Sequence, residues 1–235
     1  MKKHLPKLTQ TVKRVGFTMI ELLIVISILG ILAVAVLAAI NPIEQINRGK
    51  DTGSRSDAEQ LLSAMDRYYA STGHHPWQTS ADDVTHSGTW DPEATGNLTT
   101  GVVVVIDDLN SLEDSTGCSA LAKLATGEGM DPTCPAGSGS DEVKPTFIDR
   151  ITNPNYNHLR IYNRGGQGDS TYLCFIAKSK AFYTEAEKRC GNTTENGTTT
   201  YGAGMPSDMD PDIASSFCGG GTPQGSTPVI YSCLP

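Results

Sequence analysis

The segment "GFTMIELLIVISILGILAVAVLAAINP", residues 16–42, is apolar except for one carboxylate near its start, Glu21. The run from residue 22 to residue 40 carries no charge. At about 1.5 Å per residue, a helix of this length spans a hydrocarbon core of about 30 Å. The sequence therefore predicts a membrane-spanning helix that carries an acid close to one end.

A short basic segment precedes the apolar run. It contains five bases and no acid: Lys2, Lys3, Lys7, Lys13 and Arg14. Such a segment favours a cytoplasmic N-terminus, which places the remainder of the chain on the other side of the membrane. A secretory signal peptide has a shorter apolar region of about 7–15 residues, followed by a cleavage site. Composition alone leaves an uncleaved signal anchor open.

Glu21 needs a partner, because a charged group in a membrane helix is costly. Cleavage between Gly16 and Phe17 would create an α-amine four residues before Glu21. This amine could pair with Glu21 of the same helix or of a neighbouring one. A pair between two helices would fix their axial offset. A glutamate that reaches the head groups by itself is the alternative.

The stretch "GFTMIELLIVISILGILA", residues 16–33, resembles the N-terminal motif of type IV prepilins and of type II secretion pseudopilins. The resemblance implies cleavage after Gly16 by a membrane peptidase and N-methylation of Phe17 by the same enzyme. It also implies that Glu21 is the assembly residue. Met19 stands where the family more often has leucine. Cleavage before the apolar helix would leave that helix as a membrane anchor and later as the filament core.

The helix is expected to be disturbed at Pro42, which lacks a backbone donor, and to be weakened at Gly30. The resemblance implies that residues 30–42 can lose helical order in a filament. Beyond Ser56, which could form a capping box with Glu59, the pattern is amphipathic. We expect the apolar face to contain Ala58, Leu61, Leu62, Met65, Tyr68 and Tyr69. Thr72-Gly73 should end the helix.

The sequence thus predicts an α+β fold in which a long N-terminal helix packs on a C-terminal antiparallel sheet with disulfide-bonded loops. The expected segments are a removed leader (1–16), a transmembrane helix (17–40), an amphipathic helix (41–75) and a β-rich head (76–235). Residues 101–109 are expected to form a buried strand or a short buried helix, 159–162 and 171–177 a hairpin, and 118–125 a short helix. Residues 228–235 could be a final strand or an extended tail held by Cys233. Residues 181–192 could form a strand or a short helix, and 191–227 are expected to be surface loop.

Six cysteines, an even number, lie in the second half of the chain and favour disulfides in an oxidising compartment. Zinc is the weaker alternative because no CxxC pair occurs. Six cysteines allow 15 pairings. Pairing by neighbours would join Cys118 to Cys134, Cys174 to Cys190 and Cys218 to Cys233.

The formal net charge of the chain is −8, and all acids lie at or after Glu21. This balance argues against nucleic acid as the main partner. Asp208, Asp210 and Asp212 are spaced like the start of a calcium loop, and some pseudopilins bind calcium there. Pro211 interrupts the spacing and the turn glycine is missing, so a solvated acidic loop is the expectation and calcium the alternative. The adjacent His74 and His75 are a weak metal pair.

No phosphate loop and no GxSxG motif occurs in the sequence, and we predict no catalysed reaction. We predict a structural subunit of a type IV pilus-like filament, with adhesion, motility or DNA uptake as possible roles. Its expected partners are other subunits, the prepilin peptidase and methyltransferase, an assembly platform, and the inner membrane before assembly. The final location would be an extracellular pilus. A periplasmic pseudopilus of a type II secretion system and a membrane-anchored extracellular binding protein or enzyme are the alternatives.

Overall fold

The computed structural model describes residues 16–39, 41–80, 102–106, 109–110, 112–163, 170–195, 198–207, 209, 211–220 and 229–235. The chain divides into two compact units, one up to Pro42 and one from Ile43 to Pro235. We describe each unit by itself.

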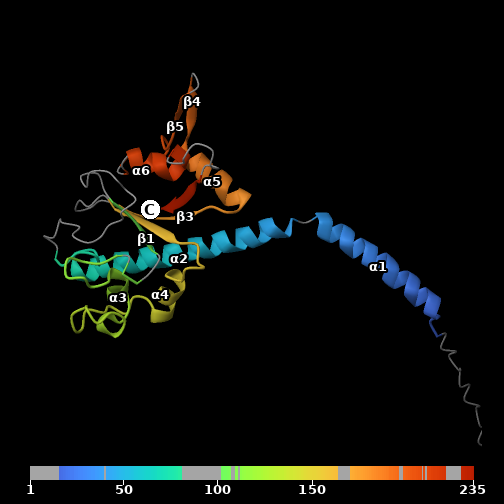
Figure 1. Ribbon diagram of the computed structural model, residues 1–235, viewed down its shortest axis with the longest axis horizontal. Coiled ribbons are helices and arrows are strands. Elements are labelled where there is room, and N and C mark those ends of the chain that lie inside the picture. Colours follow the sequence, from blue (N-terminus) through green and yellow to red (C-terminus); the bar gives the residue numbers. More distant parts are fainter. Residues whose placement is uncertain are drawn as a thin grey trace, which may run out of the picture. The chain divides into compact units, whose positions relative to one another are not determined.

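The first unit contains helix α1, Met19–Ala39 (Figure 1). Gly30 does not interrupt α1, because an isolated glycine weakens a helix without ending it. α1 ends at Ala39, and the next helix begins at Pro42, where the fixed φ of proline suits the first helical position. The loss of helical order between residues 30 and 42 in a filament stays a prediction.

The long helix α2, Pro42–Thr72, runs through Gly49 and Gly53. The predicted capping box at Ser56 and Glu59 is wrong, because Ser56 lies inside this helix. α2 ends at Thr72 as expected, and Gly73 follows with φ +77°, a conformation that glycine adopts without strain. The buried face changes character along the helix: Ala58, Leu61, Ala64, Met65 and Tyr68 are apolar, whereas Asp51, Ser54 and Asp57 in the first half are polar.

The head contains an antiparallel sheet in the order β1-β2-β3-β6. The strands are β1 (Val102–Ile106), β2 (Leu159–Asn163), β3 (Thr171–Ile176) and β6 (Tyr231–Leu234). The β2-β3 hairpin is confirmed, whereas most of the glycine-rich turn between its strands lies outside the described residues. Of the alternatives for 101–109 and 228–235, the strand is the one found in each segment. With the helices, this sheet gives the expected α+β fold.

Alternation along β2 and β3 gives the sheet two buried faces. Ile161, Leu173 and Phe175 share one core cluster with the apolar face of α2. Helices α3 (Ala120–Leu124) and α4 (Pro145–Ile151) add residues to this cluster. Tyr162 and Tyr172 point into a second cluster. The first cluster, between sheet and helices, is the main core of the head.

The expectation of a plain surface loop over 191–227 is wrong. This region contains β4 (Thr193–Glu195), β5 (Thr198–Thr200), α6 (Pro211–Ser215) and the π-type turn η2 (Ser216–Gly220). Met209, Ala214 and Phe217 from this region are buried against the second face of the sheet. Their burial explains why a segment of low apolar content is folded. Most of the segment 181–192 lies in the helix α5, Lys180–Cys190, so the helix is confirmed over the strand. A 3-10 turn η1 spans Gly127–Gly129.

Three disulfides join the six cysteines, and the pair Cys118–Cys134 is confirmed. The other two neighbour pairings are wrong: the bonds are Cys174–Cys233 and Cys190–Cys218. The antiparallel register of β3 and β6 sets Cys174 opposite Cys233, with Cα atoms 4.0 Å apart. Cys190 ends α5 and packs against Cys218 of η2. For Cys174 and Cys233, strand pairing therefore overrides proximity in the sequence.

Substitution by alanine should have opposite effects on stability at two glycines of the head. At Gly204 an added Cβ would collide with the carbonyl oxygen of Arg189 and lie 3.0 Å from the Gly191 nitrogen. Gly53 is an exposed helical position with open space around it. We expect Gly204→Ala to lower the free energy of unfolding by about 1–3 kcal/mol, and Gly53→Ala to raise it by about 0.5–1 kcal/mol. Urea denaturation of the purified chain measures both, and an unchanged stability of Gly204→Ala would contradict the packing described.

Candidate functional site

The N-terminus of α1 is closed by a capping box. Thr18 precedes the first helical residue, and its backbone nitrogen and Oγ1 donate to Glu21 Oε2 at 2.9 and 2.6 Å. The Glu21 nitrogen in turn donates to Thr18 Oγ1 at 3.3 Å. This reciprocal pattern satisfies free donors of the first helical turn and sets a carboxylate where the helix dipole favours it. Glu21 is therefore held at the helix start rather than extended away from it.

Sequence reasoning missed this box, although the signal was present. Thr18-x-x-Glu21 fits the capping-box pattern as well as Ser56-x-x-Glu59 does. The first pair stands where a helix begins, and the second pair stands in the middle of one. The pattern alone does not distinguish these two settings.

The predicted cleavage point lies just outside the helix. Gly16 and Phe17 precede α1 in non-helical backbone, and both are exposed. Phe17 exposes 84% of its surface. Cleavage between these two residues stays a prediction.

The surface of α1 is apolar on all sides. Residues Met19–Leu37 form a helix long and apolar enough to cross a membrane, and none of this segment is buried inside the protein. A helix that is hydrophobic all round is stable in lipid or inside a bundle of other helices. By its length and composition, α1 is therefore a candidate membrane span, consistent with membrane anchoring.

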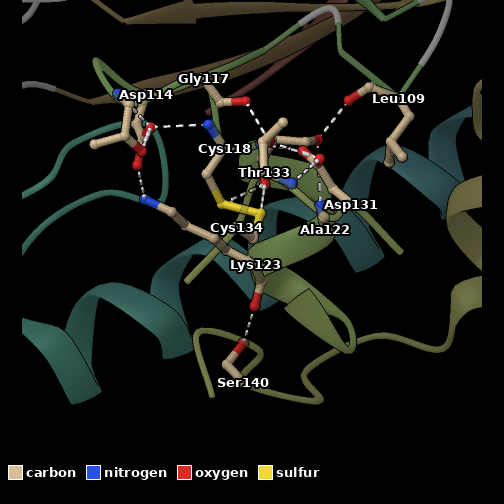
Figure 2. The surroundings of a disulfide bond; sticks show 12 residues. Leu109, Asp114, Gly117, Cys118, Ala122, Lys123, Asp131, Thr133, Cys134 and Ser140 are labelled. Carbon is tan, nitrogen blue, oxygen red and sulfur yellow. Dashed lines mark hydrogen bonds and ion pairs between the residues drawn. A yellow bond between two sulfur atoms is a disulfide. The ribbon is translucent and has the colours of Figure 1, made fainter. Parts of the chain in front are cut away.

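The head contains a second cluster of polar groups, around the disulfide Cys118–Cys134 (Figure 2). Lys123 Nζ lies 2.6 Å from Asp114 Oδ2, and both side chains are almost fully buried. Asp131 accepts from the Ser119 nitrogen at 2.8 Å. Asp131 also lies close to both cysteine sulfurs, in an arrangement that resembles a metal site. Because both sulfurs are bonded to each other, neither offers a thiolate to a metal.

These two aspartates are held in their charged form. Burial raises the pKa of Asp114, but hydrogen bonds from Lys123 and Thr116 outweigh it and hold the pKa below the ordinary value. Burial likewise raises the pKa of Asp131, but hydrogen bonds from Thr133 and Ser119 outweigh this effect, so the pKa of Asp131 is also below its ordinary value. The charged carboxylates therefore stabilise the loops that the disulfide closes.

These pKa shifts predict acid sensitivity of the head. A carboxyl whose pKa is lower in the folded state contributes stability above its ordinary pKa and loses that stability as the pH falls through the folded value. We expect the melting temperature to fall as the pH drops below 3.8, the ordinary aspartate value. Calorimetry of wild type and of Asp131→Asn checks this. The melting temperature of Asp131→Asn should be lower than that of wild type at neutral pH and should fall less steeply with pH. An equally steep fall in both proteins would contradict the role given to the Asp131 carboxylate.

The other candidate metal ligands give no site among the described residues. Asp212 lies exposed in the first turn of α6, while Asp208 and Asp210 lie outside the described residues. Calcium binding by these acids stays a prediction. His74 and His75 pack against aromatic rings instead: His74 meets Tyr68 edge-on, and His75 stacks on a tryptophan at 4.5 Å.

The features described define a protein with an N-terminal membrane-type helix and a disulfide-bonded α+β head. A family profile described as the prokaryotic N-terminal methylation motif matches residues 16–37. The chain therefore carries a prepilin-type N-terminal segment, consistent with the type IV pilin and pseudopilin family. No curated protein and no solved structure matches the chain.

Proposed function

We propose that the chain is a structural subunit of a type IV pilus-like filament and that it acts by assembly rather than by catalysis. The observation that carries the proposal is the methylation motif, which lies on an uncovered apolar helix whose first turn holds a single acid. A prepilin peptidase would cut the chain between Gly16 and Phe17 and methylate the new amine. The head would stay outside the cytoplasmic membrane.

Assembly would move α1 from lipid into a bundle of identical helices. The apolar surface of α1 is compatible with both surroundings, so the transfer exchanges lipid contacts for contacts between helices. The Phe17 amine of one subunit and Glu21 of another would then form a pair in a medium of low dielectric, where an unpaired charge is costly. A pair of this kind fixes one axial offset between neighbours.

Before assembly, Thr18 also donates hydrogen bonds to the Glu21 carboxylate with which the Phe17 amine is proposed to pair. The Glu21 carboxylate already accepts two hydrogen bonds from Thr18. A carboxylate oxygen accepts more than one donor, and Oε1 of Glu21 takes no part in these two bonds. The capping box therefore supports the proposal, because it orients the carboxylate at the helix start and leaves one oxygen for the amine.

Isolation of filaments tests the proposed function. Surface appendages sheared from cells that express the chain should contain the processed chain as an integral subunit, and antibody against the head should label their length in electron micrographs. The matched control is Gly16→Val, which should remain uncleaved in the membrane fraction. Recovery of processed wild-type chain solely as dispersed monomer would contradict the proposal.

A pseudopilin of a type II secretion system remains the second candidate, because such proteins carry the same N-terminal motif. Its filaments would stay periplasmic instead of reaching the surface. Calcium binding by Asp208, Asp210 and Asp212 would favour it. The measurement is the melting temperature of the chain with calcium against the same protein with magnesium; a rise specific to calcium would favour the pseudopilin.

A further inference from the structure

The start of α2 and the start of α5 lie together at one end of the head. The carboxylate of Asp51 accepts from the backbone nitrogens of Lys178 and Ser179 at 3.0 and 2.7 Å. Glu44 accepts from the backbone nitrogen of Lys180 at 2.8 Å. These bonds set the loop before α5 beside the first turns of α2.

Four bases belong to the two segments that these bonds join, and we call this part of the head the basic end: Arg48, Lys50, Lys178 and Lys180. All four are exposed, and within the described part of the chain none of them forms an ion pair. Their two acidic neighbours, Glu44 and Asp51, accept backbone hydrogen bonds instead. By contrast, five other bases of the head are paired with carboxylates: Arg55, Arg67, Lys123, Arg150 and Arg189.

The basic end contrasts with the charge of the chain as a whole. From residue 41 onward the sequence has 13 bases and 25 acids, so this part of the chain is strongly acidic. Four of those bases lie at the basic end. A local excess of positive charge on an acidic head is complementary to a negatively charged surface.

Two exposed isoleucines precede the basic residues. Ile43 and Ile46 expose 68% and 58% of their surface, although both belong to the same compact unit as the head. Only residues 40 and 41 separate the last residue of α1 from the first residue of α2. Because the chain spans at most about 3.6 Å per residue, the beginning of α2 stays at the membrane surface when α1 is inserted.

We propose that the basic end, together with Ile43 and Ile46, rests on the anionic phospholipid head groups of the membrane that holds α1. The isoleucines enter the boundary between head groups and acyl chains, and the four cations contact phosphates. Surfaces that combine apolar side chains with lysine and arginine bind anionic membranes in this way. The contact orients the head before assembly. The inference rests on α1 as a membrane anchor and not on filament formation.

Amine labelling of the full uncleaved chain in vesicles tests this. The chain is reconstituted at low density into phosphatidylcholine alone or into phosphatidylcholine mixed with phosphatidylglycerol. A membrane-impermeant acetylating reagent is added, and mass spectrometry follows each lysine. We expect Lys50, Lys178 and Lys180 to react about fivefold more slowly in the anionic vesicles, the size expected for one ammonium held at an anionic surface. High salt should remove the protection. The control lysines are Lys144 and Lys188, which are exposed and lie outside the basic end. Each of them should react at the same rate in the two kinds of vesicle.

A double variant separates the surface from general effects of lipid. Lys178→Gln with Lys180→Gln keeps the backbone nitrogens that bond α2, so the head stays folded, and Lys50 should regain most of its reactivity. Lys144→Gln with Lys188→Gln should leave the protection of Lys50 unchanged.

Three results would overturn the inference. If the chain floats with the vesicles and each of the five lysines is labelled at the same rate in both lipids, this inference is wrong while the membrane anchor stands. Protection that rises with protein density in phosphatidylcholine would show that the basic end contacts another copy of the chain instead. A chain that floats with neither vesicle would overturn the membrane anchor as well.

Discussion

The Glu21→Ala variant is expected to be cleaved and methylated normally, yet to yield roughly a hundredfold fewer filaments or none. The reason is that removing one partner of a buried charge pair costs about 3–5 kcal/mol. The cost falls on assembly, since the Phe17 amine would be left unpaired among apolar helices. It does not fall on processing, which occurs one turn earlier in the chain. Mass spectrometry of the N-terminus and quantification of sheared filaments measure the two steps separately.

Two further variants separate the charge of Glu21 from its role in the capping box. Glu21→Gln retains a side-chain oxygen that accepts from Thr18, as glutamine does in capping boxes, but it has no charge for the amine. Thr18→Val removes the hydroxyl, which is one donor and the acceptor of the box, and it keeps the backbone donor at residue 18 and the carboxylate. We expect Glu21→Gln to fail in assembly like the alanine variant, and Thr18→Val to assemble with a modest reduction. Normal filaments from Glu21→Gln would assign Glu21 to helix capping and contradict the register role.

Asp51→Ala is expected to destabilise the head by about 3 kcal/mol or more, because several buried donors lose their acceptor and each unsatisfied group costs about 1–3 kcal/mol. Asp51 is completely buried in α2. It accepts from the backbone nitrogens of Lys178 and Ser179, and from Ser179 Oγ at 2.7 Å. These groups form the start of α5, so the carboxylate also interacts favourably with the dipole of that helix.

The matched control is Asp66→Ala, an exposed acid on the same helix. A surface substitution of this kind should change the free energy of unfolding by less than about 0.5 kcal/mol. Denaturant titration of both variants gives the comparison. Hydrogen exchange should also show loss of protection concentrated in α5. Equal stability of the two variants would mean that α5 is held to α2 by other contacts.

Much of the architecture could be predicted because local signals sufficed for it. The uncharged run 22–40 predicted a membrane-length helix, and Gly73 marked the end of α2. The hairpin of β2 and β3 followed from its apolar, β-branched strands and the glycine-rich segment between them, whereas the β-branched run at 102–106 left a strand and a short buried helix open. Each of these signals depends on residues close together in the chain.

The parts that could not be predicted depend on contacts between distant residues. The burial of Asp51 and Asp57 was not predicted from the sequence, because their partners are far along the chain. Lys178 and Ser179 donate to Asp51, and the Tyr156 hydroxyl donates to Asp57 at 2.7 Å. The cysteine pairing failed for the same reason, because the register of β3 and β6 decides it. The burial of Phe217 in a polar region likewise depends on the sheet face that it covers.

The mass of the N-terminal peptide of the mature protein tests the central claim most directly. The account predicts a chain that begins at residue 17 with one added methyl group on the phenylalanine amine, and that still contains the whole of α1. A mature chain that retains Met1, or one that begins after Pro42 with α1 removed, would contradict it.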